Sequence, residues 1–408
     1  MGSREKIVVG LDIGSTKVCT LIADSELNPI GVGNADSKGI KKGSIVNIEA
    51  AVASIKKSVR EAEDMAGCEV ETVYVGLAGG HIKSFNSLGV TSIPTRSREI
   101  NTDDVRRVIE TARAVALAPD REIIHILPQE FTVDDQHGIA DPLGMFGTRL
   151  EVNVHIVTSS TTAAQNTVTA VNRSGHLVGD TVLEPIAVGE AILGEDEKEL
   201  GCVLVDIGGG KTNIAIYHRG AVRHTVVVPV GAELFTSDIA VGLRTSIPEA
   251  ERLKRDQGCA LSSMAASDSV FEVTGLGSHQ PRAIAQQVLS DIIQPRAEEI
   301  AHFVRNEIRN AGFEKQAVAG VVLTGGGAML RAFPELIEGV LDMPVRIGTT
   351  SGFGDKLLEK MPRLMGPEFA TAAGLVLYGE RRWKTQDFHE SSNSGFKKLV
   401  TKFRSFLL

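Results

Sequence analysis

Two glycine-rich turns, each preceded by an aspartate, restrict what this chain can fold into more than any other feature. In Val203–Tyr217 (VLVDIGGGKTNIAIY) an apolar run ends in Asp206, three glycines follow, and a second alternating apolar run begins. This order predicts strand, tight turn and strand, with the carboxylate at the tip of the first strand. Glycine lacks a Cβ, so the N–H groups of the turn can approach an anion, and Asp206 would face that anion through a metal ion. A purely structural hairpin is an equal alternative for one such turn alone.

The same arrangement occurs a second time in the chain. Val8–Ala23 (VVGLDIGSTKVCTLIA) repeats the order of strand, turn and strand, with Asp12 at the tip of its first strand. Tyr74–Gly80 and Val322–Ala328 form a second matching pair, in which an apolar run closes on small residues. Such repetition indicates two related halves. Two Asp-tipped hairpins facing each other across a cleft could hold the phosphates of a nucleotide and a Mg²⁺ ion.

On these residues the chain resembles the actin-like ATPase superfamily. A further string within residues 129–158, QEF…GIADPLGMFGTRLEVNVHIVT, together with the tail described below, resembles the FtsA family of bacterial cell-division proteins. The resemblance implies an α/β fold of the duplicated actin-like (ribonuclease H-like) type. Two lobes would enclose a nucleotide cleft, with an FtsA-type 1C insertion and a C-terminal amphipathic helix.

The two halves carry their extra sequence at different places. The stretch between the aspartate and the following Gly-Gly pair is much longer in the second half, whereas the first half carries its extra sequence after Gly80. We therefore expect two accessory subdomains. The predicted parts are lobe 1 (1A) in residues 1–80, 159–200 and about 355–384, the 1C subdomain in 81–158, lobe 2 (2A) in 201–229 and 310–354, the inserted 2B subdomain in 230–309, a flexible linker in 385–394 and a membrane-targeting helix in 395–408.

The resemblance implies that ATP or ADP binds with Mg²⁺ between the lobes. Asp12 and Asp206 would hold the metal ion, mostly through water. Glu251 and Lys254 would lie against the ribose and adenine, although their spacing alone favours a solvated ion pair. The predicted nucleotide-binding residues are Asp12, Gly14, Ser15, Thr16, Lys17, Asp206, Gly208, Gly209, Gly210, Lys211, Thr212, Glu251, Lys254, Gly325, Gly326 and Gly327.

Two segments resemble the helices that connect the lobes of actin-like proteins. One begins at Glu184 (EPIAVGEAIL) and the other is Phe369–Gly379 (FATAAGLVLYG); both contain small residues that allow close packing. Relatives place a group that orients the attacking water at the position of Glu184. A helix-capping or structural carboxylate is the equal alternative.

The second turn departs from the family pattern. Lys211 and Asn213 stand where relatives more often have Thr and Asp. A second cation beside the phosphates would strengthen nucleotide binding and weaken Mg²⁺-assisted turnover. We therefore expect binding with slow or undetectable ATP hydrolysis.

The 2B subdomain of FtsA-like proteins receives the acidic C-terminal peptide of the tubulin-like protein FtsZ. Arg282 and Arg296 are the candidates to pair with its carboxylates, because arginine supplies fixed bidentate donors. Both lie in a long helical pattern over residues 282–312 that Pro295 breaks or kinks. Ordinary surface arginines are the alternative. The resemblance also implies that the 1C subdomain contacts a neighbouring subunit in filaments and binds later division proteins.

The last fourteen residues, Gly395–Leu408 (GFKKLVTKFRSFLL), combine helically spaced apolar residues with four basic and no acidic side chains. The rest of the chain carries 39 basic against 51 acidic residues, so this strip favours an anionic membrane over docking on the body of the protein. The predicted membrane residues are Phe396, Lys397, Lys398, Leu399, Val400, Lys402, Phe403, Arg404, Phe406 and Leu407.

Composition limits the alternatives. A net charge of −8 argues against general nucleic-acid binding, and no apolar window approaches the length of a membrane span. The sequence predicts an ATP-binding actin homologue that polymerises on the membrane, anchors FtsZ filaments (the Z ring) to the cytoplasmic face of the inner membrane and recruits later division proteins. A pilus-biogenesis scaffold of the same fold is the first alternative. A kinase is a weaker one, because no convincing Asp general base is found.

Overall fold

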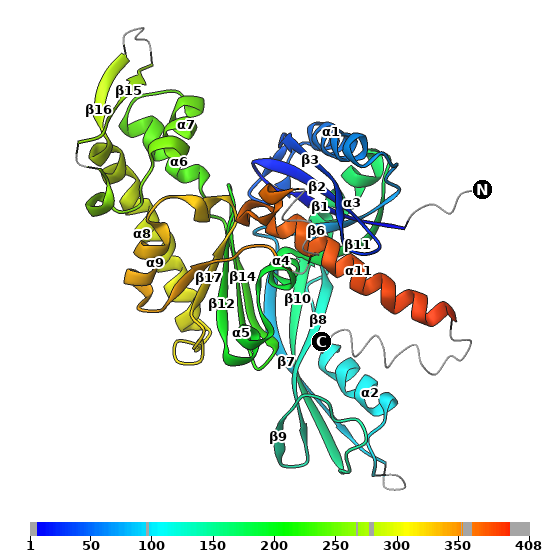
Figure 1. Ribbon diagram of the computed structural model, residues 1–408. Helices are drawn as coiled ribbons and strands as arrows, with labels where there is room; N and C mark the ends of the chain where they lie inside the picture. Colours follow the sequence, from blue (N-terminus) through cyan, green and yellow to red (C-terminus); the bar gives the residue numbers. More distant parts are fainter. Residues whose placement is uncertain are drawn as a thin grey trace.

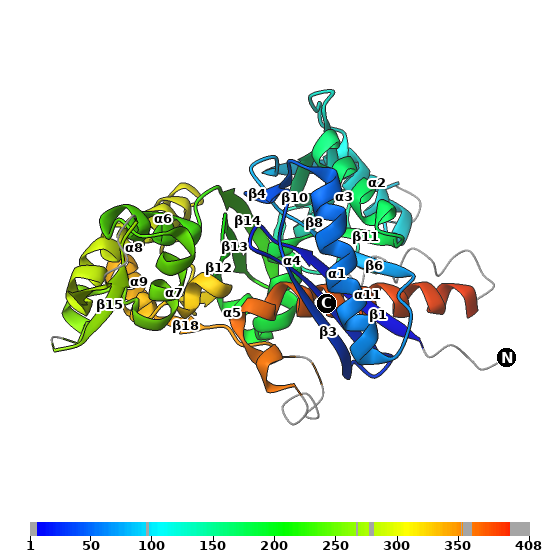
Figure 2. The same cartoon turned by 90° about the horizontal axis from the view of Figure 1, so that it is seen from above.

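Two lobes, each built on a five-stranded sheet, lie side by side in the computed structural model (Figures 1 and 2). The structure describes residues 6–94, 98–266, 268–276, 281–351, 353 and 361–391. The predicted membrane helix, residues 395–408, lies outside the described residues.

The sheet of lobe 1 has the strand order β11-β6-β1-β2-β3. Its central strand β1 pairs antiparallel with β2 and parallel with β6. Helices α1 and α3 pack on one face, and α11 packs on the other. The elements are β1 (Ile7–Ile13), β2 (Lys17–Asp24), β3 (Pro29–Asp36), the hairpin β4 (Ile40–Lys41) and β5 (Ser44–Ile45), α1 (Ile48–Ala66), β6 (Thr72–Leu77), α3 (Thr161–Arg173), β11 (Leu177–Leu183) and α11 (Ala370–Ser391).

The sheet of lobe 2 repeats this plan, with the strand order β14-β13-β12-β17-β18. Its central strand β12 again pairs antiparallel with the next strand, β13, and parallel with β17. The two sheets therefore correspond strand for strand, which confirms the duplicated fold predicted from the two Asp-tipped turns. The elements are α5 (Glu195–Leu200), β12 (Cys202–Ile207), β13 (Thr212–His218), β14 (Ala221–Val228), β17 (Val321–Thr324), α9 (Phe333–Leu341) and β18 (Val345–Ile347).

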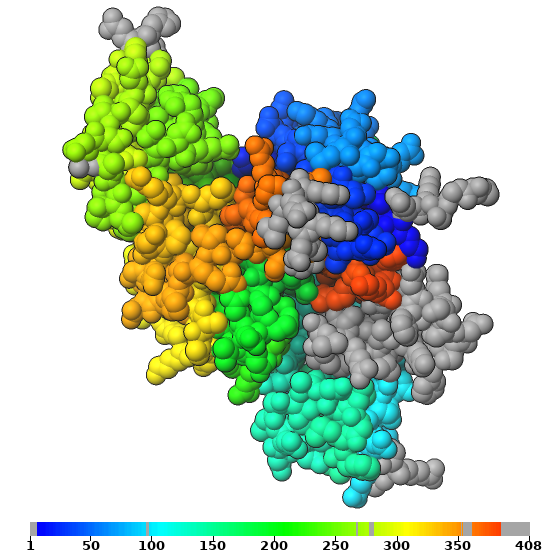
Figure 3. All heavy atoms as spheres, viewed as in Figure 1, coloured from blue at the N-terminus to red at the C-terminus, as the bar shows by residue number. Residues whose placement is uncertain are grey.

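Residues 81–158, called the first insertion below, form a four-stranded sheet of order β7-β10-β8-β9 with helix α2 packed on it. The strands alternate between buried apolar and more exposed residues, and they enclose a core of their own. In the space-filling view the first insertion projects away from the rest of the molecule (Figure 3). The elements are β7 (Lys83–Ser92), α2 (Thr102–Arg113), β8 (Arg121–Val133), β9 (Gln136–Ile139) and β10 (Arg149–Ser160).

Residues 230–309, called the second insertion below, carry three helices and a β-hairpin beside lobe 2. The long helical pattern predicted over residues 282–312 is wrong at its start, because Arg282 lies on strand β16. Pro295 lies inside α8 without ending it; the apolar face of α8 is buried in the core of lobe 2, which offsets the lost hydrogen bond. The elements are α6 (Glu233–Gly242), α7 (Ile247–Gln257), β15 (Val270–Thr274), β16 (Pro281–Ala285) and α8 (Gln286–Asn310).

Two helices join the lobes, α4 (Glu184–Ile192) and α11, and they pack against each other. A Cβ on Gly374 of α11 would clash with the carbonyl oxygen of Ala187 in α4. A Cβ on Gly189 of α4 would in turn clash with the hydroxyl of Tyr217. Glycine at these positions lets the two helices approach closely between the lobes.

Helix α11 is longer than the sequence predicted. It continues to Ser391, so residues 385–391, predicted to be part of a flexible linker, are helical, and residues 392–394 lie outside the described part of the chain. The polar composition of this stretch resembles that of a linker, but it contains neither Gly nor Pro before Ser391 to end a helix that lobe 1 has already begun. None of the helices in the described residues is both long and apolar enough to cross a membrane.

Candidate functional site

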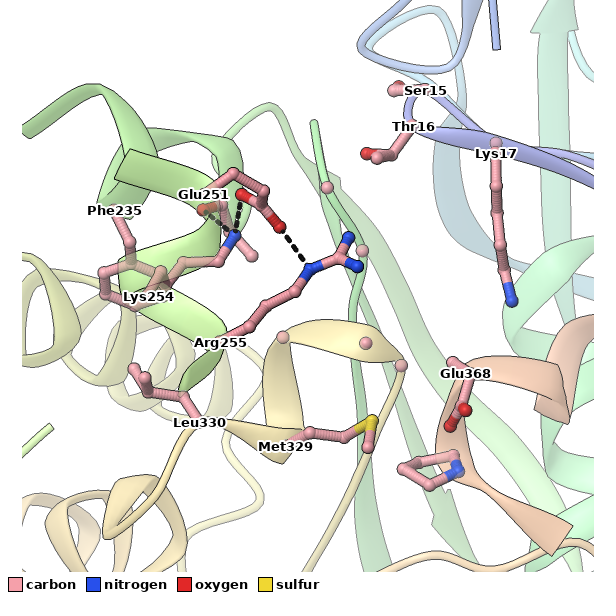
Figure 4. A pocket seen from close by; sticks show the side chains of 18 of the residues that line it. Ser15, Thr16, Lys17, Phe235, Glu251, Lys254, Arg255, Met329, Leu330 and Glu368 are labelled. Atoms are coloured by element: carbon pink, nitrogen blue, oxygen red, sulfur yellow. Dashed lines mark hydrogen bonds and ion pairs between the residues drawn. The ribbon is translucent and has the colours of Figure 1, made fainter. Parts of the chain in front are cut away.

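A cavity of about 730 Å³ lies between the lobes (Figure 4). Both Asp-tipped turns reach it, together with α7 and the loop that follows β17. The structure thus brings together all but one of the residues predicted to bind nucleotide. Those that line the cavity are Asp12, Gly14, Ser15, Thr16, Lys17, Asp206, Gly208, Gly209, Gly210, Lys211, Glu251, Lys254, Gly325, Gly326 and Gly327.

Thr212 is the predicted residue that the cavity does not include. It is buried, and its hydroxyl donates a 2.8 Å hydrogen bond to the carbonyl oxygen of Val230. Side chains alternate along a strand, so the residue after Lys211 faces away from the cavity. Thr212 therefore stabilises the chain where it enters the second insertion.

The two turns touch each other at the base of the cavity. A Cβ on Gly209 would overlap the hydroxyl of Thr16, and a Cβ on Gly210 would lie 2.8 Å from Ser15 Oγ. Gly325, after β17, has a φ of 80° and would place a Cβ against a carboxylate oxygen of Asp206. Side chains therefore pack directly against the backbone at these positions, which favours glycine there in addition to any contact with an anion.

Asp206 is buried and Asp12 is half-buried on the cavity wall. Burial, and then the negative charge of Glu184, raise the pKa of Asp12 to about 7 and that of Asp206 to about 6, although Lys211 and Lys17 act in the opposite direction. Buried carboxylates of this kind suit a hard divalent cation such as Mg²⁺. Within the described residues, however, no group of three His, Cys, Asp or Glu side chains could enclose a metal ion. A cation here would need further ligands from water or phosphate.

Glu184 is the first residue of α4 and is only 3% exposed. One of its carboxylate oxygens accepts a 2.7 Å hydrogen bond from Lys211 Nζ, and the other accepts one of 3.0 Å from Asn213 Nδ2. Asn213 Nδ2 also donates to Asp206 at 2.9 Å. Lys211, predicted as a second cation beside the phosphates, lines the cavity and forms an ion pair with Glu184. No local sequence pattern indicates this pairing, because the two residues come from different lobes.

The α7 side of the cavity contains a compact polar cluster. Lys254 Nζ lies 2.6 Å from a carboxylate oxygen of Glu251, so the predicted pair exists, and both members are partly buried instead of solvated. Burial raises the pKa of Glu251, but hydrogen bonds from Lys254 and Thr236 outweigh it and hold the pKa below its usual range. Arg255 donates to the other Glu251 oxygen at 2.8 Å and extends toward the middle of the cavity (Figure 4).

Several lining residues were missed by the sequence analysis. Arg255 follows Lys254 directly and could have been found as a third charged residue on the same helix. Met329, Leu330, Arg331 and Glu368 adjoin segments with a recognised motif but carry none of its characteristic residues. Phe235 and Gln286 come from segments with no motif, and their placement depends on the fold.

The two arginines proposed for the FtsZ peptide differ in their surroundings. Arg296 already forms a bidentate ion pair with Asp238, at 2.8 and 3.2 Å, and contacts Glu299 as well. Arg282 is exposed, and its guanidinium donates to the carbonyl oxygen of Leu243. The structure therefore leaves Arg282 far more accessible to an acidic partner than Arg296.

Comparison with solved structures identifies the class of the fold. A chain of the PilM-PilN type IV pilus biogenesis complex superposes with a TM-score of 0.66, covering 91% of this chain and 98% of that chain at 17% identity. MreB5 of Spiroplasma citri bound to ADP superposes with a TM-score of 0.56, covering 95% and 99% at 13% identity. At these identities the likeness concerns the fold alone, and it is that of the actin-like proteins.

Sequence comparison identifies the family within that class. The family described as cell division protein FtsA matches residues 203–374, and the SHS2 domain inserted in FtsA matches residues 79–158. Cell division protein FtsA of Pseudomonas aeruginosa is 43% identical over 378 residues, covering 92% of this chain and 89% of that protein. FtsA of Escherichia coli K12 is 37% identical over 410 residues, covering 97% and 94%. This chain belongs to the FtsA family of actin-like cell-division proteins, as its motifs predicted.

Proposed function

We propose that this protein binds ATP or ADP with Mg²⁺ in the cavity between its lobes, assembles with copies of itself and holds FtsZ filaments on the cytoplasmic face of the cell membrane. The observation that carries the nucleotide part is the meeting of both Asp-tipped turns at one cavity of about 730 Å³. That volume is in the range usual for small-molecule and cofactor sites.

The residues around the cavity fit a nucleotide in one orientation. The backbone N–H groups of the two glycine turns would receive the phosphates, with Lys17 as the nearby cation. Mg²⁺ would neutralise phosphate charge beside Asp12 and Asp206. Glu251 and Lys254 would then face the ribose and base. The ADP bound to MreB5, a protein of the same fold, supports this assignment.

The membrane part of the proposal depends on residues 395–408, whose basic and apolar pattern suits anionic lipid. A variant lacking these residues should no longer sediment with vesicles that contain phosphatidylglycerol, while its affinity for ATP stays unchanged. The matched control is Lys56→Glu/Lys57→Glu, which removes two exposed basic residues from α1 and should leave sedimentation intact. Sedimentation of the truncated protein at the wild-type level would exclude the tail as the anchor.

The FtsZ part of the proposal rests on the second insertion. The guanidinium of exposed Arg282 donates a hydrogen bond to the carbonyl oxygen of Leu243, the residue next to Arg244. Leu276 lies beside the same segment, because its backbone N–H donates to the carbonyl oxygen of Arg244. Val241 and Leu276 on the same segments are 77% and 70% exposed. Basic and apolar side chains together suit a peptide that carries carboxylates and apolar residues.

Fluorescence anisotropy with a labelled FtsZ tail peptide tests this surface. Arg282→Glu should weaken binding at least tenfold. Arg296→Glu should weaken it less, because Arg296 is already paired with Asp238. Unchanged affinity in both variants would remove this surface from consideration.

The proposal also concerns the first insertion, which would recruit later division proteins and contact a neighbouring subunit. Its strand β7 lies at the edge of the sheet, with Phe85, Leu88 and Val90 37%, 54% and 39% exposed. An exposed apolar edge strand is a ready surface for another chain. Leu88→Lys should therefore disturb one of these two contacts. It should reduce either the pelleting of nucleotide-bound polymers or the capture of a division partner. The affinity for nucleotide should stay unchanged.

A further inference from the structure

The surroundings of Glu184 differ from those of a carboxylate that is ready to act on water. Both of its oxygens accept hydrogen bonds inside the protein, one from Lys211 Nζ and one from Asn213 Nδ2. Lys211 is 5% exposed and also donates to the carbonyl oxygen of Ala78 at 3.2 Å. The carboxylate is thus held by two donors in a buried site at the edge of the cavity.

We propose that Lys211 is a positioning residue that keeps Glu184 from assisting the attack of water on a bound nucleoside triphosphate, so that the cavity retains the triphosphate. This inference rests on the proposed nucleotide-binding function and specifies how turnover at that site is restrained.

The chemistry explains why the pairing matters. In hydrolysis the oxygen of water bonds to the γ-phosphorus, the bond from that phosphorus to the bridging oxygen breaks, and a nucleoside diphosphate leaves with that oxygen. The attacking water must give up a proton, and a carboxylate within hydrogen-bond reach can orient the water and accept this proton. Glu184 is the carboxylate in the cavity that begins a connecting helix, but its charge is engaged by the ammonium of Lys211.

Releasing Glu184 would be costly. If its carboxylate turned toward the cavity, a buried ammonium and a buried amide would lose their acceptor, and removing one partner of a buried pair destabilises strongly. The pair also connects the two halves, because Lys211 precedes β13 of lobe 2 whereas Glu184 and Ala78 follow strands of lobe 1.

A different cation is available for the phosphates. Lys17, on the first turn, lines the cavity, and its Nζ lies 4.1 Å from the centre of the Phe369 ring. In Figure 4 its side chain extends along the opposite wall from Lys254 and Arg255. Lys211 can thus stay with Glu184 without leaving the phosphates uncompensated.

Single-turnover measurement of phosphate release from ATP tests the proposal. Lys211→Thr should raise the rate at least tenfold over wild type, and Lys211→Thr/Glu184→Gln should return it to the wild-type level. Lys211→Arg, which keeps the positive charge, should stay slow. Lys211→Met, which fills the space of the lysine stem but offers no donor, should also be faster than wild type and serves as the second variant if Lys211→Thr does not fold.

Two further readouts separate positioning from a structural effect. The affinity for AMPPNP, measured by calorimetry, should change less than threefold in Lys211→Thr. Urea unfolding of the nucleotide-free protein should show that Lys211→Gln and Glu184→Gln are coupled, with a non-additive effect of at least tenfold on the unfolding equilibrium constant.

Two results would overturn the proposal. One is a folded Lys211→Thr or Lys211→Met protein that binds AMPPNP and hydrolyses ATP no faster than wild type. The other is additivity of Lys211→Gln and Glu184→Gln in urea unfolding, which would show that Lys211 does not hold Glu184. A wild-type protein that binds no nucleotide would instead refute the proposed function, and the coupling measurement would still decide whether the pair exists.

Discussion

The hydroxyl of Thr16, in the first turn, donates a 3.1 Å hydrogen bond to the carboxylate of Glu233, the first residue of α6 beside the other lobe. Glu233 is itself fixed, because its backbone N–H donates to the carbonyl oxygen of Gly209 in the second turn. A side chain from one half thus contacts a residue whose backbone is bonded to the turn of the other half. This contact links the two halves beside the point where the two turns meet.

Glu233→Ala should speed the release of a bound nucleotide. A hydrogen bond to a charged group at a partly exposed site contributes on the order of 1 kcal/mol, which corresponds to an approximately fivefold faster rate if the contact must break before release. Stopped-flow fluorescence of bound mant-ADP measures this rate. The control is Glu335→Gln, an exposed carboxylate on α9. Equal release rates in wild type and Glu233→Ala would show that the contact does not limit opening.

Two glycine-to-alanine substitutions should have opposite effects on stability, because only one of them lies at the contact between the connecting helices. Gly374→Ala should lower the free energy of unfolding by about 2 kcal/mol, because its Cβ would clash with the carbonyl oxygen of Ala187. Gly339→Ala, within α9, has nothing within 4 Å of its Cβ and should stabilise by up to about 1 kcal/mol through helix propensity. Urea unfolding measures both. Stabilisation by Gly374→Ala would mean that the helices can separate at little cost.

The duplicated fold could be predicted because its signal is local and occurs twice. Asp12 and Asp206 each lie one residue before the end of a strand, small residues follow, and each turn leads into a second strand, so sequence order alone determines the hairpins. Two copies of one unit then imply two similar sheets. The gathering of both turns at one cavity follows from that symmetry and was predictable for the same reason.

Features that depend on contacts between distant segments could not be predicted. Lys211 was expected beside phosphate, but the carboxylate that takes its charge is Glu184, which precedes it by 27 residues and comes from the other lobe. Thr212 was grouped with its neighbours although strand alternation turns it away. Pro295 was expected to break or kink the helix, and tertiary burial keeps α8 continuous across it. For Lys211 and Pro295 packing outweighed the local pattern, whereas the alternation that turns Thr212 away from the cavity is itself local and could have been used in the prediction.

The histidine at the junction of the first insertion and lobe 1 gives a pH prediction. His125 of β8 is buried, and its Nε2 accepts a 2.9 Å hydrogen bond from the backbone N–H of Leu183, just before Glu184. An acceptor nitrogen carries no proton, so the ring is neutral in the folded protein. Burial lowers the pKa of His125 to about 4, from a usual value of 6.5.

The sign of the effect follows from proton binding. Between pH 6.5 and 4 the unfolded chain binds a proton at His125 and the folded protein does not, so the stability due to this group is complete above pH 6.5 and falls as the pH is lowered. At pH 5 the loss is about 2 kcal/mol. Asp12 and Asp206 act in the opposite direction, because their pKa values are raised in the folded protein.

Comparison with a His125→Gln variant isolates this contribution, because the carboxylates are the same in both proteins. The Gln side-chain oxygen can accept the Leu183 N–H and does not titrate. Urea unfolding at pH 7 and pH 5 should show that the stability advantage of wild type over the variant shrinks by about 2 kcal/mol at the lower pH. Parallel pH profiles would mean that His125 is protonated as easily in the folded protein as in the unfolded chain, and that the Leu183 N–H has another acceptor.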